Sequence, residues 1–151
     1  MTHLSRRPVR TAPTRKITSS LAVGVALAAL SAANAGATTA PTFTVVIDSL
    51  LCHTTEDNSG PDEPFLLGNN VRIWGNGSLN NEESANVNAT FDGQGTASIK
   101  LYDADLGSWP DYHDFLGEVV VNADQVDQGS QTGTFTKDGA SYEVYYHVNS
   151  R

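Results

Sequence analysis

Short segments in which apolar and polar residues alternate constrain this chain more than any other feature. In the segment from Ser141 to Val148, Tyr142, Val144 and Tyr146 fall on the same face as Val148. Alternation with a period of two is the pattern of a half-buried β-strand. Segments of this kind recur along the chain between turn residues, and no convincing helical period accompanies them. The sequence therefore predicts an all-β fold, an antiparallel two-sheet β-sandwich of about seven or eight strands.

The expected strands and turns follow from the same alternation. Gly75-Asn76-Gly77 is the strongest hairpin-turn signal, and residues 122–130 are expected to form a loop or a single helical turn. The expected strands are residues 43–50, 65–74 with a polar break at 68–70, 85–91, 97–101, 119–121, 131–136 and 141–148.

The first 35 residues have the pattern of a secretory signal peptide. Basic residues precede a short apolar run at residues 21–30 (LAVGVALAAL), and small residues follow up to Ala35. This order predicts cleavage after Ala35, with Ala37 as the second choice. The apolar run is too short for a membrane span. We therefore expect a secreted protein with a signal peptide at 1–35, a disordered linker at 36–42 and one domain at 43–151.

Removal of the leader makes the chain strongly acidic. Five of the nine Lys and Arg residues leave, so four basic residues remain against seventeen acidic ones, a formal charge of −13. Clustered Lys and Arg hold phosphate backbones and anionic lipid headgroups, so this composition argues against nucleic acid as a partner. The single cysteine, Cys52, excludes an internal disulfide and is expected to be a small buried hydrophobe.

Two acidic loops are the candidate functional sites. Asp103 and Asp105 lie at i and i+2 on a chain that is still extended, so their carboxylates leave the same face. Carboxylates gathered from one loop or two can bind a cation, and calcium fits best because it accepts six to eight oxygen ligands in tolerant geometry. The alternative is a solvated acidic turn, since Asp is common in turns. The acidic residues of the two loops are Glu56, Asp57, Asp62 and Glu63 in the first and Asp103, Asp105, Asp111 and Asp114 in the second.

The motifs in these loops resemble those of the C2 domain, the calcium- and phospholipid-binding β-sandwich. Residues 55–67 (TEDNSGPDEPFLL) resemble its first loop, and Tyr-Asp-x-Asp followed by Asp-Phe-Leu-Gly resembles its third. The first strand runs straight into the first acidic loop, as in family members with permuted strand order. Asp-Glu-Pro stands where the family has Ser-Asp-Pro, and the lysine-rich strand of many lipid-binding members is missing. The resemblance implies calcium ligands at Asp57, Asp62, Asp103, Asp105 and Asp114, with Glu56, Glu63 and Asp111 as substitutes.

The expected function is binding, not catalysis. Calcium would order the loops and create a surface for a membrane, a glycan or a protein, with Trp109 and Tyr112 at the loop tip as contacts. A monomer is expected. One alternative is a secreted inhibitor-like interaction protein in which calcium is only structural. A carboxylate-based hydrolase is less expected, because nothing in the sequence separates an acid from a base.

Overall fold

The structure is a computed structural model that describes residues 39–56, 60–75, 77–105 and 113–151. The predicted leader lies outside these ranges, and Ala37–Arg151 form one compact unit. No helix in the described ranges is long and apolar enough to cross a membrane.

The described chain is built from eight strands and one short turn of 3-10 helix. The predicted strands all occur, most of them longer than expected, and the 3-10 turn falls within the predicted loop at residues 122–130. The elements are β1 Thr42–Thr54, β2 Pro64–Gly68, β3 Val71–Gly75, β4 Ser84–Gln94, β5 Thr96–Asp103, β6 Asp114–Asn122, η1 Ala123–Gln125, β7 Ser130–Phe135 and β8 Ser141–Ser150.

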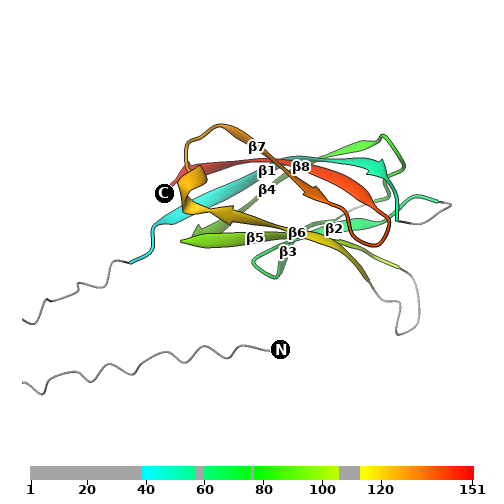
Figure 1. Ribbon diagram of the computed structural model, residues 1–151, viewed down its shortest axis with the longest axis horizontal. Helices are drawn as coiled ribbons and strands as arrows, with labels where there is room; N and C mark the ends of the chain where they lie inside the picture. The colour runs from blue at the N-terminus through cyan, green and yellow to red at the C-terminus, as the bar shows by residue number, and fades with distance from the viewer. Residues whose placement is uncertain (1–38, 57–59, 76, 106–112) are drawn as a thin grey trace, which may run out of the picture. The chain divides into compact units, whose positions relative to one another are not determined.

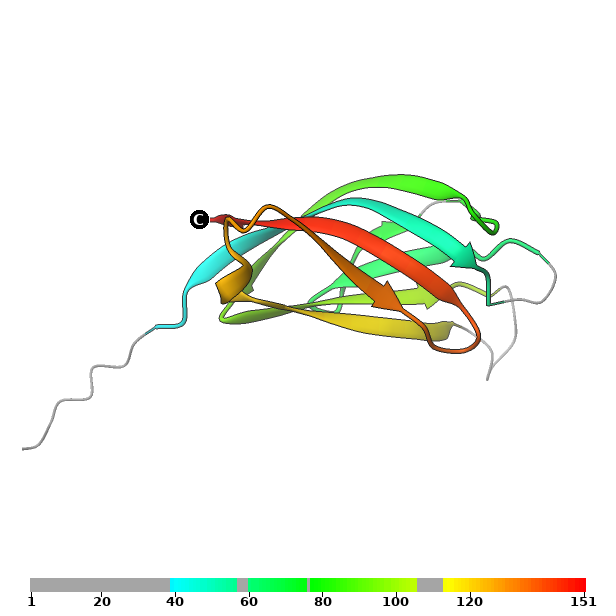
Figure 2. The same ribbon diagram turned by 45° about the horizontal axis from the view of Figure 1, so that its top comes forward.

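The strands form a two-layer antiparallel sandwich (Figures 1 and 2). One layer has the order β4-β1-β8-β7 and the other has the order β3-β2-β5-β6. Strands β4 and β5 pair only through Gln94 and Thr96, on either side of the turn at Gly95. Because this junction is so short, the hydrogen-bonded path folds over into two layers. The first and last strands, β1 and β8, are neighbours.

The core lies between the layers and is formed by alternate residues of the strands. Phe43, Val45 and Ile47 of β1 are fully buried, as the alternation predicted. A bulge between Ile47 and Ser49 then shifts the register, so that Leu50 and Cys52 also face inward. Cys52 is thus a buried free thiol, as predicted, and burial raises its pKa.

The strands that flank Gly75-Asn76-Gly77 do not form the hairpin that this signal predicted, since β3 pairs with β2 and β4 pairs with β1 and β5. Asn76 itself lies outside the described ranges. The tight turn lies between β2 and β3. Asn69 and Asn70 there have φ of 47° and 66°, and two central residues with positive φ are what a two-residue hairpin turn requires. Asparagine adopts this region more readily than most residues. Gly75 instead permits a close approach, since a Cβ there would lie 2.5 Å from Cβ of Phe65.

Candidate metal centre

Described acidic residues from both loops meet at one end of the sandwich, where β1 and β5 end and β6 begins, on the right of Figure 2. Glu56 follows β1, Asp105 follows β5, Asp114 begins β6 and Asp138 lies in the β7–β8 turn. In an antiparallel sandwich the strand connections cluster at the two ends, which explains how residues far apart in sequence converge.

Asp103 is the buried member of this cluster. Its side chain is 0% exposed, and its Oδ1 accepts hydrogen bonds from the backbone N–H of Glu63 at 2.5 Å and of Ala104 at 2.9 Å. Its Oδ2 is buried and has no hydrogen-bond partner within the described part of the chain. Burial, followed by the charge of Asp62, raises the pKa of Asp103 from 3.8 to about 6, against the opposing effect of the two N–H donors. Burial of a carboxylate oxygen without a donor costs free energy, and a bound cation is one way to offset that cost.

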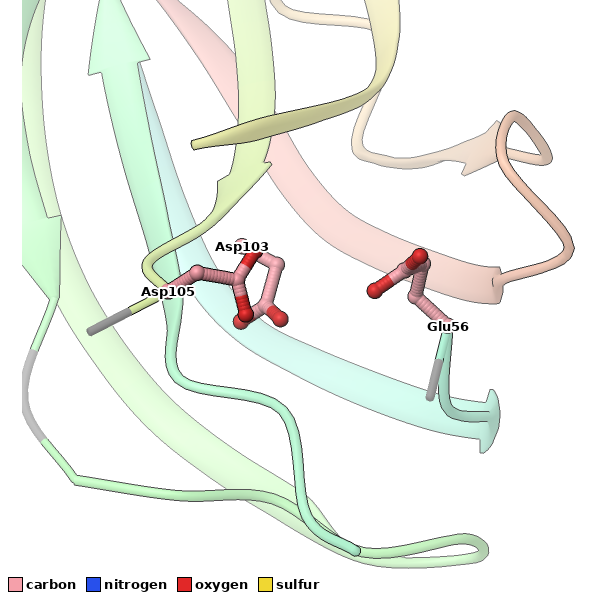
Figure 3. A group of neighbouring side chains, drawn as sticks. All are labelled: Glu56, Asp103 and Asp105. Atoms are coloured by element: carbon pink, nitrogen blue, oxygen red, sulfur yellow. The ribbon is translucent and has the colours of Figure 1, made fainter. Parts of the chain in front are cut away.

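Two groups of three neighbouring carboxylates lie at this end of the sandwich, and Glu56 belongs to both. One oxygen each of Glu56, Asp103 and Asp105 lie within 4.8 Å of one another, and the same is true of Glu56, Asp114 and Asp138. Figure 3 shows Asp103 and Asp105 side by side, with Glu56 directed toward them from the end of β1. Glu56, expected only as a substitute, is therefore the residue that connects the two groups.

Asp62 is held differently from the other acidic residues. It is 0% exposed, and its carboxylate accepts the backbone N–H of Glu56 at 2.9 and 3.0 Å and the hydroxyl of Tyr142 at 2.6 Å. Its backbone pairs with Leu79 through two hydrogen bonds of 3.0 and 2.8 Å. In this structure Asp62 anchors the first loop and positions Glu56; it is in neither group of carboxylates.

Tyr142→Phe is expected to lower the free energy of unfolding by about 1.5–3 kcal/mol, because a buried carboxylate loses a donor. Urea denaturation measures this loss. Tyr146→Phe is the matched control: the Tyr146 hydroxyl accepts a hydrogen bond from the neutral Gln125 side chain at 3.2 Å, so its loss costs about 0.5–1.5 kcal/mol. Equal losses in both variants would contradict the anchoring role of Asp62.

The remaining predicted residues divide into two kinds. Glu63 has an exposed side chain and contributes through its backbone, which donates to Asp103 and accepts from the N–H of Ala104 at 3.2 Å. Four predicted residues lie outside the described ranges, namely Asp57, Asp111, Trp109 and Tyr112. Their roles, and metal ligation by the others, stay predictions.

Asp138 was missed by the sequence analysis. The signal was present as the turn Lys137-Asp138-Gly139, in which Asp138 and Gly139 have φ of 54° and 83°. A hairpin at this position returns the chain at the same end of the sandwich as the two acidic loops. Counting strand reversals would have placed its carboxylate near theirs.

A row of three aromatic rings, with a cation over the ring at each end, lies beside the site. It covers the outer face of the layer β3-β2-β5-β6. The neighbours Leu66 and Leu101 face the core, so Phe65 and Tyr102 face outward. The rings of Phe65 and Tyr102 stack with centroids 5.3 Å apart, and Phe115 lies 5.1 Å from Tyr102. The guanidinium of Arg72 lies 4.7 Å from the ring centroid of Phe65, and the ammonium of Lys137 lies 4.4 Å from that of Phe115. Each end of this aromatic row is therefore covered by a cation.

Comparison with known proteins identifies the fold. No protein-family model matches this sequence, and no curated protein is detectably similar to it. A structure of extended synaptotagmin 2 containing two C2 domains matches with a TM-score of 0.51 and 17% identity, over 89% of this chain and 48% of that one. This chain thus spans about half of that structure.

Two single-domain structures are also similar. One is described as a C2 domain, with a TM-score of 0.47 and 13% identity over 71% of this chain and 98% of that chain. The other is a C2 domain of plant extended synaptotagmin 1, with a TM-score of 0.48 and 13% identity over 76% of this chain and 98% of that chain. The match to extended synaptotagmin 2 shows that the chain has a C2-like β-sandwich fold, as the resemblance predicted.

Proposed function

We propose that this protein is a secreted calcium-binding module, whose acidic loops bind calcium and so order a surface for a further ligand. The observation that carries the proposal is Asp103 Oδ2, a fully buried carboxylate oxygen without a donor among the described residues. This oxygen belongs to a side chain grouped with the carboxylates of Glu56 and Asp105. A cation would satisfy all three at once.

The chemistry of the ligand set favours calcium. Both groups consist of carboxylates alone, and hard oxygen ligands suit calcium and magnesium, whereas zinc prefers nitrogen and sulfur. Calcium tolerates irregular geometry and many oxygens, while magnesium demands a near-ideal octahedron and keeps its waters. Ligands drawn from two connections of the sandwich in the first group, and from three in the second, fit the more tolerant ion.

The ion would act by ordering the loops. Glu56, Asp103 and Asp105 would hold one position, and Glu56, Asp114 and Asp138 a second. Without a cation these carboxylates repel one another, and a bound ion would remove that repulsion and add a further link between the connections.

We propose a binding role and no catalytic one. A general acid must reach the atom that it protonates. Asp103, the carboxyl whose pKa is raised, is 0% exposed. Its burial therefore supports a role in holding an ion more than a role in contacting a substrate.

A thermal melt of residues 36–151 tests the proposal. After chelation, 10 mM calcium is expected to raise the melting temperature by about 5–10 °C, since a ligand at ten to a hundred times its dissociation constant adds roughly 1.4–2.7 kcal/mol. Magnesium should give a smaller rise. The variant Asp103→Asn/Asp105→Asn should show no rise with calcium.

The control removes two charges from the opposite end of the sandwich. Asp124 and Asp127 are exposed and lie in or next to η1, so Asp124→Asn/Asp127→Asn should keep the full calcium response. A melting temperature unchanged by either ion would overturn the proposal and reduce the acidic groups to solvated turns.

A further inference from the structure

An open cavity adjoins the candidate metal centre on the side of the β7–β8 turn. It has a volume of about 660 Å³, and its wall includes the backbone of Gly60 and Gly139. The described side chains that line it carry hydroxyl, amide or carboxylate groups: Thr54, Thr55, Glu56, Asn80, Asn81 and Asp138. Two of these, Glu56 and Asp138, also belong to the second group of carboxylates.

The described lining disfavours two classes of ligand. An acyl chain needs an apolar wall, and none of the described lining residues is a large hydrophobe. A phosphate or sulfate group is best held by Arg or Lys donors, and the described lining offers none, so only a bound ion could attract such a group. Neighbouring amides and carboxylates are instead the groups that exchange hydrogen bonds with hydroxyls.

Two amide side chains of the wall are fixed in place. Oδ1 of Asn81 accepts the backbone N–H of Thr55 at 2.8 Å, so its orientation is set. The backbone N–H and the side-chain amide of Asn80 both donate to the Glu83 carboxylate, at 2.9 and 3.2 Å. Side chains ordered before a ligand arrives lose little entropy when they bind it.

We propose that this cavity binds a neutral saccharide, held by the amide wall and by a calcium ion at Glu56 and Asp138. The inference rests on the proposed calcium binding. Hydroxyl oxygens are hard ligands, so a sugar can complete the coordination shell of an ion at the cavity wall. The ion would also neutralise the negative charges of Glu56 and Asp138, so these carboxylates would no longer attract a cationic amine.

Asn81→Asp is the decisive variant. It keeps an oxygen to accept the Thr55 N–H, replaces the amide donor by a carboxylate and leaves the calcium ligands unchanged.

The probes are immobilised neutral oligosaccharides of glucose, mannose, xylose and N-acetylglucosamine, with residues 36–151 as analyte. In calcium the protein should bind at least one of them, and chelation or Asn81→Asp should weaken that binding by about tenfold or more. Asn149→Asp, the same change on exposed Asn149 at the opposite end, should have no effect.

Calorimetric titration of calcium on the same samples separates the possible failures. Calcium binding without binding to any oligosaccharide overturns the inference and leaves the proposed function standing. Absence of calcium binding overturns the proposed function itself. Binding of spermidine that calcium displaces and Asn81→Asp strengthens would overturn the saccharide in favour of an amine.

Discussion

Asp103→Asn is expected to stabilise the calcium-free protein at pH 7 by up to about 3 kcal/mol. The pKa of Asp103 is raised from 3.8 to about 6, chiefly by burial, and each unit of pKa shift corresponds to about 1.4 kcal/mol. Asparagine carries no charge to bury. Its oxygen can accept the N–H groups of Glu63 and Ala104 that Oδ1 now accepts, and its NH₂ group would take the position of the Oδ2 that lacks a donor.

The sign of the pH dependence follows from the direction of the pKa shift. Between about pH 4 and pH 6 the folded protein binds a proton at Asp103 that the unfolded chain has released, so this residue's contribution to stability falls as the pH rises. The wild type and Asp103→Asn should therefore be nearly equal below about pH 4 and differ fully above about pH 6. Urea denaturation in chelator across this range measures the difference.

Calcium should reverse the order of the two proteins. The wild type gains the free energy of ion binding, whereas Asp103→Asn lacks a charged ligand and gains little. Asp124→Asn, an exposed substitution in η1, should follow the wild type under both conditions. If Asp103→Asn is less stable than the wild type at pH 7 in chelator, burial of this charged carboxylate does not destabilise the calcium-free protein as its raised pKa indicates.

The strands could be predicted because burial of one face imposes alternation on the sequence. The limit of this reasoning is visible in β1, where the bulge between Ile47 and Ser49 changes which residues face the core. A bulge depends on pairing with β4 and β8, which local alternation does not contain. The turn at Asn69-Asn70 was predicted only as a polar break, since glycine signals positive φ more strongly than asparagine does.

The candidate site could be predicted only where its geometry is local. Asp103 and Asp105 were placed together because their i, i+2 spacing fixes a common side. Asp62 looked like a further ligand, but its role depends on Tyr142, which approaches from β8. Asp138 depends on the β7–β8 turn reaching the same end. Tertiary partners decide whether a given acidic residue faces a cation, anchors a loop or is solvated.

Phe65→Ala is expected to reduce both stability and calcium affinity. Phe65 is 6% exposed, and truncating a buried Phe to Ala costs about 3–5 kcal/mol. It stacks on Tyr102, and its neighbour Pro64 pairs with Asp103. The ring of His113, beside Asp114, meets Phe65 edge-on at 5.0 Å. The aromatic row therefore braces segments that lead into both acidic loops, and loss of such support typically weakens metal binding by about tenfold or more.

Phe43→Ala is the matched control, because it separates loss of stability from loss of support. Phe43 is fully buried at the start of β1, beside Gly93 and far along the strand from Glu56. Its truncation should cost a similar 3–5 kcal/mol, about the same as that of Phe65, yet leave calcium affinity unchanged. Calorimetric titration is made at a temperature at which circular dichroism shows both variants folded. A calcium affinity lowered equally in both variants would mean that it tracks global stability. An affinity lowered only in Phe65→Ala would mean that the outer aromatic row positions the calcium ligands, because loss of core packing at Phe43 would then leave calcium affinity unchanged.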